Sequence, residues 1–164
     1  MIKIGLLSDT HGFIDNQYLD FLKDVDEVWH AGDIGSLPCY EKLYNFKPLR
    51  AVYGNIDGTN IRIRTKEHLR FKIDNLDVWI THIGGYPGNY SPYVKTEIHK
   101  NPPDLFICGH SHILKVINDK KLGLLHINPG AAGNSGLHNV KTIVRFEIHE
   151  SRVKNLEIFE MERR

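Results

Sequence analysis

The fold of this chain is decided around one stretch, Ile107-Cys108-Gly109-His110-Ser111-His112. It places two histidines two residues apart, directly after an apolar run and a glycine. Side chains two apart on an extended backbone point to the same side, so we expect both imidazoles to face one point. Neutral imidazole is the commonest protein ligand for metals. Taken alone, the pattern is also typical of an ordinary solvated loop, and the rest of the sequence must decide between the two.

Four earlier stretches repeat the same arrangement of a short apolar strand followed by a polar turn. In open α/β sheets, ligands gather beyond the carboxyl ends of the strands, so we expect the polar side chains of these turns to meet. The four stretches are Met1–Leu7 before Asp9 and His11, Asp26–His30 before Asp33, Leu49–Tyr53 before Asn55, and Leu76–Thr81 before His82.

The first half of the chain alternates strands with helices. Apolar residues at helical spacing predict helices over Asp15–Lys23 and Ser36–Phe46, with Asp15 and Ser36 at their N-caps. This alternation predicts βαβ units and a parallel sheet. The second half reads mainly as antiparallel pairs, with turns at Asp74-Asn75, Asp119–Lys121 and Glu150-Ser151 and one helix ending near Lys100.

The fold class that these patterns predict is α/β, with two facing mixed sheets and helices outside. We expect one domain over residues 1–164, because the sequence contains no repeat, linker or low-complexity segment. The two cysteines, Cys39 and Cys108, are too few for a disulfide framework. The first apolar stretch is too short for a signal peptide and no run approaches a membrane span, so we expect a cytoplasmic protein without a membrane partner.

The charge of the chain limits its partners. The formal net charge is +1, and Lys and Arg are scattered rather than gathered in a stripe. A nucleic-acid backbone is therefore not expected as a partner, except where a small nucleotide is the substrate. A homo-oligomer is left open.

The polar set at the strand ends comprises two carboxylates, one amide oxygen and four imidazoles. A single metal ion rarely uses seven protein ligands, whereas two ions that share one carboxylate would use all of them. Mixed oxygen and nitrogen ligands without thiolate suit Mn²⁺, Fe, Co²⁺ or Zn²⁺. Paired metals roughly 3.5–4 Å apart are an arrangement for in-line phosphoryl displacement.

These residues resemble a known family. Five motifs of the calcineurin-like metallophosphoesterases, and in particular of their small YfcE-like phosphodiesterase branch, are matched in order. They are Asp9-Thr10-His11, Gly32-Asp33, Gly54-Asn55, His82 after a strand, and Gly109-His110-Ser111-His112.

The resemblance implies a four-layer αββα sandwich and a phosphodiesterase that hydrolyses a small phosphoester. It implies two divalent ions, Mn²⁺ being expected and Zn²⁺, Fe, Ni²⁺, Co²⁺ or Mg²⁺ the alternatives, with a metal-bridging hydroxide attacking phosphorus in line. One ion would be held by Asp9, His11, Asp33 and His112, and the other by Asp33, Asn55, His82 and His110.

The sequence departs from the family pattern at two places. Ser36 follows Gly32–Gly35 where many members have a second aspartate. Ile56 stands where many members have the histidine that donates a proton to the leaving group. Asp57 is the nearest replacement acid by sequence, although fixing a turn through backbone amides is its favoured role. The alternative to an enzyme is a non-catalytic binding scaffold of the same fold, like a retromer subunit.

Two further features are left open by the sequence. Tyr86, Tyr90 and Tyr93 could form an aromatic platform for a substrate group, or pack a loop or an oligomer contact. His138 lies in a glycine-rich loop that could reach the cleft.

Overall fold

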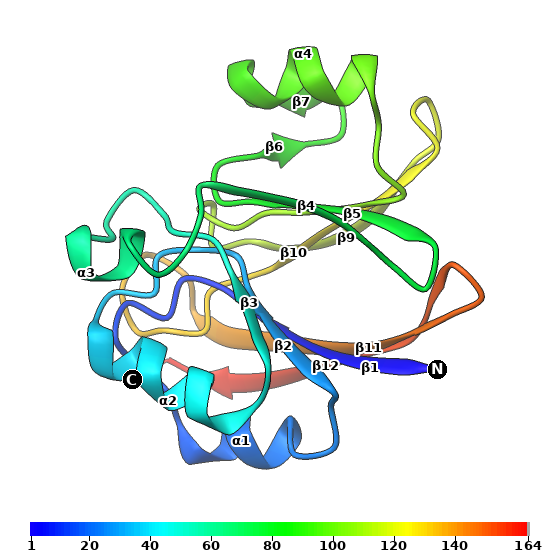
Figure 1. Cartoon of the computed structure of the whole chain (residues 1–164). Helices are drawn as coiled ribbons and strands as arrows, with labels where there is room; N and C mark the ends of the chain where they lie inside the picture. Colours follow the sequence, from blue (N-terminus) through cyan, green and yellow to red (C-terminus); the bar gives the residue numbers. More distant parts are fainter. Residues whose placement is uncertain (164) are drawn as a thin grey trace.

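Two five-stranded sheets face each other in the computed structural model, which describes residues 1–163 (Figure 1). The first sheet has the strand order β12-β11-β1-β2-β3, with β1, β2 and β3 parallel and β11 antiparallel to its neighbours. Its strands are β1 (Ile2–Leu7), β2 (Glu27–His30), β3 (Leu49–Ala51), β11 (Val140–His149) and β12 (Arg152–Glu162).

The second sheet has the order β4-β5-β8-β10-β9 and is also mixed. Its three central strands run parallel, and an antiparallel strand closes each edge. The strands are β4 (His68–Ile73), β5 (Leu76–Thr81), β8 (Leu105–Ile107), β9 (Leu114–Asp119) and β10 (Leu124–Pro129).

Helices cover the outer faces of both sheets, which completes the predicted αββα order (Figure 1). The first sheet is covered by α1 (Asn16–Phe21) and α2 (Leu37–Phe46), and the second by α4 (Pro92–Lys100). The predicted N-caps are confirmed, since the side chains of Asp15 and Ser36 accept hydrogen bonds from backbone N–H groups at 2.8 and 3.3 Å.

Apolar side chains from the inner faces of both sheets form the central core. Alternation along each strand sends every second residue inward, so Ile4, Leu6, Val78 and Ile80 are fully buried between the sheets. Trp29 bridges the layers, with its ring edge-on to Phe71 of β4 and Phe146 of β11. This packing fixes the two sheets to each other and brings the ends of their parallel strands to one side.

Two small features were not predicted. The segment between β5 and α4 contains a short hairpin, β6 (Gly85–Tyr86) and β7 (Asn89–Tyr90), and helix α3 (Thr59–Arg62) follows the turn after β3. Both are too short to produce a periodic sequence pattern. The hairpin turns at Asp74-Asn75 and Glu150-Ser151 are confirmed by the strand registers on either side of them.

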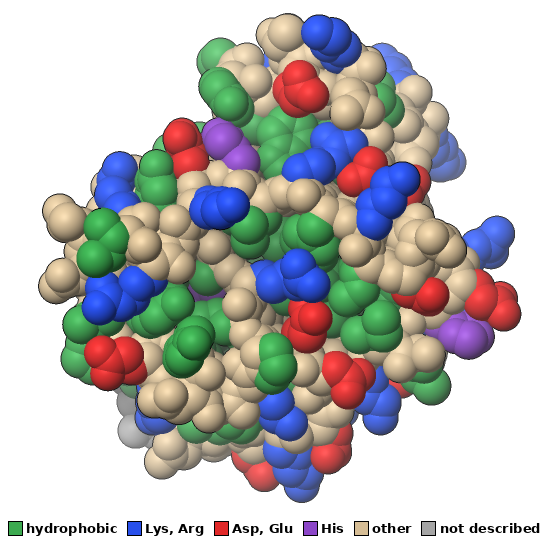
Figure 2. Space-filling view, in the orientation of Figure 1, with side chains coloured by type: hydrophobic (Ala, Val, Ile, Leu, Met, Phe, Trp, Pro, Cys, Tyr) green, Lys and Arg blue, Asp and Glu red, His purple; other side chains and the backbone are tan. Residues whose placement is uncertain are grey.

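The surface carries charges of both signs. On the face shown in Figure 2, Lys and Arg side chains are interspersed with Asp and Glu, and no continuous basic stripe crosses the residues drawn in colour. In residues 1–163, no helix is long and apolar enough to cross a membrane.

Candidate metal centre

The predicted ligands lie on loops at one end of the sandwich, directly after β1, β2, β3, β5 and β8. Six of them form two groups, in each of which the candidate ligand atoms lie within 4.8 Å of one another. The first group is Asp9, His11 and His112, and the second is Asp33, His82 and His110. The seventh residue, Asn55, is exposed and lines a cavity together with His82.

The two groups adjoin each other through their carboxylates. The Oδ2 atom of Asp33 lies 3.1 Å from Nε2 of His82, in its own group, and 3.5 Å from Nε2 of His11, in the other. The Oδ1 atom of Asp9 lies 3.2 Å from Nε2 of His112 and 3.8 Å from Nε2 of His82. One oxygen of Asp33 therefore faces nitrogen atoms of both groups.

The expectation that the imidazoles of His110 and His112 face one point is wrong. Both residues have left-handed backbone conformations, with φ of 72° and 64°, so the rule for extended strands does not apply to them. Their side chains instead contribute to different groups. The family resemblance also assigns these two histidines to different ions, and the full ligand sets that it implies stay a prediction.

Hydrogen bonds orient the ligands from behind. Oδ2 of Asp9 accepts bonds from the Ser8 hydroxyl at 2.7 Å and from the backbone N–H of His110 at 3.1 Å. Nδ1 of His82 lies 2.7 Å from the carbonyl oxygen of Ala31 and donates to it, which leaves the Nε2 lone pair free to face the centre.

The atoms that remain free are those a metal ion would use. Oδ1 of Asp9, Nε2 of His11 and Nε2 of His82 are buried and have no hydrogen-bond partner within residues 1–163. Leaving a buried polar atom unpaired costs about 1–3 kcal/mol, so three converging ones require a compensating ligand. The donor set of carboxylate oxygens and imidazole nitrogens suits a divalent ion, and the residues therefore fit the metal that the fold implies.

The charges in the centre support one another. Burial acts to raise the pKa of Asp33, but the close approach of the His82 imidazole outweighs burial and holds the pKa below its usual value. Burial likewise acts to lower the pKa of His82, but the carboxylates of Asp33 and Asp9 raise it overall. Burial lowers the pKa of His110. The carboxylates are thus ready to bind a cation at neutral pH.

Two glycines allow the loops to approach this closely. A Cβ atom on Gly54 would collide with the carboxylate and backbone nitrogen of Asp33. A Cβ atom on Gly109 would collide with Ser8 and with Oδ2 of Asp9. The glycines of the two motifs are therefore required by the contact between loops.

His30 connects two of the loops that carry predicted ligands, a role that the sequence did not indicate. It is fully buried, and its Nδ1 accepts a bond from the backbone N–H of Gly32 at 3.0 Å. Its Nε2 therefore carries the proton and donates to the Thr10 hydroxyl at 3.0 Å, while that hydroxyl donates to the carbonyl of Ile34. Burial lowers the pKa of His30 to about 4, so the neutral ring links the loops that carry Asp9 and Asp33.

Asp57 is buried and occupied by backbone bonds. Its carboxylate accepts hydrogen bonds from the N–H groups of Gly35 and Gly54, both at 2.8 Å, and of Ile34 at 3.1 Å. This is the turn-fixing role favoured by the sequence. The neighbouring Ile56, at the position where many members of the resembled family have a proton-donating histidine, is exposed.

His138 does reach the centre. Its ring centroid lies 5.1 Å from that of His112, and its Nε2 lies 2.7 Å from the carbonyl oxygen of Gly133. The sequence left this placement open, because a glycine-rich loop has no periodic pattern that fixes its path.

The three tyrosines that could form an aromatic platform have different surroundings. Tyr90 is buried and donates its hydroxyl proton to Asp119, while Tyr86 lies beneath the ammonium group of Lys115. Only Tyr93 among the three lines the cavity beside His82. The prediction of an aromatic platform built from all three tyrosines is therefore wrong.

The sequence is similar to those of known phosphoesterases. Residues 2–151 match the model of the calcineurin-like phosphoesterase superfamily domain. A phosphodiesterase of Methanocaldococcus jannaschii is 29% identical over 147 residues, which cover 79% of this chain and 83% of that protein. A probable metallophosphoesterase of Methanothermobacter thermautotrophicus is 29% identical over 135 residues, covering 78% of this chain and 76% of that protein.

Solved structures share the fold over nearly the whole chain. A structure described as a novel archaeal phosphodiesterase has a TM-score of 0.74 and 25% identity, covering 98% of this chain and 100% of that one. A single mutant of the Vps29 protein of Entamoeba histolytica has a TM-score of 0.77 and 18% identity, covering 98% of this chain and 99% of that one, a likeness of fold alone. The five strand-end motifs, the αββα layers and the family match agree, and the chain belongs to the calcineurin-like phosphoesterase superfamily.

Proposed function

We propose that this protein is a phosphodiesterase that depends on two divalent metal ions, with residues 1–164 as its catalytic domain. The observation that carries the proposal is the position of Asp33, whose Oδ2 atom lies 3.1 and 3.5 Å from imidazole nitrogens of the two ligand groups. A carboxylate between two sites is the natural shared ligand. Asp9, His11 and His112 would complete one site, and Asn55, His82 and His110 the other.

Two divalent ions, when bound, supply activation of a water nucleophile and neutralisation of charge on the phosphoryl oxygens. The chain supplies two carboxylates, so the loaded centre keeps a net charge of roughly +2 and attracts an anionic phosphoester. Asp33 would hold both sites at a fixed separation, and the bond from His82 to Ala31 would hold that ring in the ligating tautomer. Of the expected ions, Mn²⁺ remains the one we propose first.

The residues near the leaving group favour diesters. Ile56 cannot donate a proton, and the carboxylate of Asp57 is already bonded to three backbone N–H groups. We therefore assign Asp57 a positioning role through the turns after β2 and β3, rather than the role of acid. Without a general acid the site favours a leaving group that departs unprotonated, and aryl diesters satisfy this better than alkyl monoesters.

The test is a panel of phosphomonoesters and phosphodiesters, each measured with Mn²⁺, Ni²⁺, Co²⁺, Zn²⁺ and Mg²⁺. We expect aryl diesters to be hydrolysed fastest. His82→Ala should remove this activity, whereas His149→Ala, a matched change of an exposed histidine at the other end of the sandwich, should leave it intact. A metal-loaded protein without activity on any member of the panel would overturn the proposal and favour the binding scaffold.

A further inference from the structure

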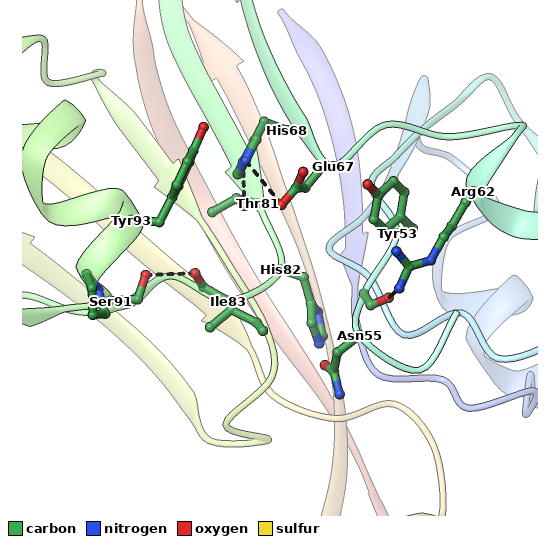
Figure 3. A pocket seen from close by; sticks show the side chains of 12 residues that line it. Tyr53, Asn55, Arg62, Glu67, His68, Thr81, His82, Ile83, Ser91 and Tyr93 are labelled. Atoms are coloured by element: carbon green, nitrogen blue, oxygen red, sulfur yellow. Dashed lines mark hydrogen bonds and ion pairs between the residues drawn. The ribbon is translucent and has the colours of Figure 1, made fainter. Parts of the chain in front are cut away.

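A cavity of about 550 Å³ opens from the second ligand group, with Asn55 and His82 at its inner end. Figure 3 shows Tyr93 and His68 on one side, Tyr53 and Arg62 on the other, and the two ligands below them. The volume lies within the range of about 300–1,000 Å³ that is usual for small-molecule sites. A cavity of this size beside His82 has room for one arm of a phosphoester bound at the centre.

The two sides of the cavity present aromatic rings that are held in place. Tyr93 stacks on His68 with ring centroids 4.7 Å apart and an angle of 6° between the planes. On the opposite side, the guanidinium group of Arg62 lies 4.5 Å from the centre of the Tyr53 ring. Arg62 is itself fixed, because its Nε donates to the carbonyl of Asp57 and its Nη2 to the carbonyl of Gly54.

Tyr93 is unusual for a packed aromatic residue, since it is 68% exposed although it stacks on His68. An aromatic side chain with one covered and one open surface suits stacking by a flat ligand. Tyr44 on α2 is a similarly exposed tyrosine, at 62%, but it lies outside this cavity.

The polar groups of the cavity favour a heteroaromatic ring over a lipid or a second anion. Arg62 and Glu67, which carry opposite charges, both line the cavity, and the Glu67 carboxylate is 65% exposed. Nε2 of His68 is buried and has no hydrogen-bond partner within residues 1–163, and it lies 3.7 Å from Glu67. The exposed Glu67 carboxylate can accept a hydrogen bond from the edge of a ring, which an alkyl chain cannot donate.

We propose that this cavity is the subsite for one ester arm of the substrate, and that the arm carries a planar nitrogen heterocycle such as a nucleobase. Tyr93 and Tyr53 provide the stacking surfaces, and Glu67 accepts a hydrogen bond from the ring edge. The substrate class is then a nucleoside phosphodiester. This inference rests on the proposed function, because the cavity is assigned to an arm of the ester that the centre would hydrolyse.

The first experiment compares two diesters with the same leaving group, the para-nitrophenyl esters of thymidine monophosphate and of methyl phosphate. Stacking of one base on an aromatic residue corresponds to roughly 5- to 150-fold in affinity, so we expect the wild type to prefer the nucleoside ester by about tenfold in kcat/KM. Tyr93→Ala should lower this preference by about tenfold, mainly through KM for the nucleoside ester. Tyr93→Phe keeps the ring and should keep the preference, and Tyr44→Ala should leave both esters unaffected.

The second experiment measures equilibrium binding of adenosine monophosphate by calorimetry in the presence of Mn²⁺, so that the cavity is tested even without turnover. We expect Tyr93→Ala to weaken this binding about tenfold, and Tyr93→Phe and Tyr44→Ala to preserve it. If neither ester is hydrolysed but the nucleotide binds with this pattern, the proposed function fails and the subsite stands. If Tyr93→Ala changes neither the preference nor the binding, the subsite is overturned whatever the activity.

Discussion

The two ends of the sandwich use the same uncommon backbone conformation for different reasons. Within residues 1–163, ten residues other than glycine have positive φ. Five of them are candidate metal ligands at one end, namely Asp9, His11, Asp33, His110 and His112. The other five are Asp74, Asn75, Glu150 and Ser151 in hairpin turns at the opposite end, and Asn155 in β12.

At the hairpin end the local chain requires the conformation. A two-residue connection between antiparallel strands needs positive φ at both central residues to match the twist of the strands. The two turns also support each other, since the N–H of Glu150 donates to Asp74 at 3.0 Å. The conformation here follows from pairing along the chain.

At the ligand end, no pairing between adjacent strands requires the positive-φ conformation. The left-handed residues follow parallel strands, and contacts between distant loops hold them, such as the bond from the N–H of His110 to Asp9. A side chain in this conformation costs about 1–2 kcal/mol per residue. Strain that is maintained by the surrounding structure gathers at functional sites, which supports placing the function of this molecule at this end.

The largest difference in activity should be found between substitutions of two aspartates that share this backbone conformation. Asp33 has φ of 58° and Asp74 has φ of 49°. Asp33→Asn should lower phosphodiesterase activity by roughly 10³-fold, because the charge that would offset two cations is lost. Asp74→Asn should keep full activity and cost about 1 kcal/mol of stability, as for one weakened hydrogen bond. Steady-state rates and denaturant unfolding of both variants check this, and equal activities would break the comparison.

The next effect concerns the leaving group. Ile56→His would place an imidazole at the ligand end where proton donation is absent, and general acid catalysis is worth roughly 10²–10⁴-fold. We expect turnover to rise more on diesters with poor leaving groups than on aryl diesters. The measurement is the rate as a function of leaving-group pKa for the wild type and the variant. The same shallow slope in both proteins would mean that another group already donates the proton.

As the pH falls, the protein should lose its bound metal ions before it unfolds. In the metal-free centre, Asp33 and Asp9 raise the pKa of His82, so a proton competes with metal as the pH falls through that raised value. Metal content and activity should therefore fall together in mild acid, and metal content that stays flat down to roughly pH 4 would contradict a histidine-rich site.

Unfolding in acid follows from other histidines and can be followed separately by circular dichroism. Burial lowers the pKa of His30 and of His126 to about 4, below the free value of about 6.5. The unfolded chain therefore takes up these protons first, and stability falls as the pH drops between these two values.

The smallest effect lies at the hairpin end. Glu150 has φ of 51°, a conformation that asparagine tolerates better. Glu150→Asn should raise the free energy of unfolding by up to about 1 kcal/mol without changing activity. The same replacement at His110, which has φ of 72°, should instead remove activity. If asparagine at Glu150 and at His110 both stabilised the protein and removed its activity, the two ends of the sandwich would not differ in the way described.

Much of this organisation could be predicted from the sequence. Strands and helices with a periodic pattern, such as β1 and α2, were found together with their caps because local chemistry determines them. The strand-end positions of the ligands followed from the same pattern. Helix α3 and the β6–β7 hairpin were missed because four-residue and two-residue elements leave no period.

The details of the site could not be predicted, because they depend on contacts between loops. The backbone at His110 and His112 is left-handed, so side chains two residues apart do not point to the same side there as they would on an extended strand. His30 supports the centre only because its strand places it beneath both Thr10 and Gly32. His138 approaches His112 through a loop whose path is set by tertiary contacts.

The most direct test of the account is the metal content of the purified, metal-loaded protein. Elemental analysis after dialysis should give two divalent ions per chain for the wild type and for Asp74→Asn. Asp33→Asn should lose both, since its Oδ2 atom faces both ligand groups. A wild-type protein that binds a single ion, or an Asp33→Asn variant that keeps two, would contradict the shared-carboxylate centre.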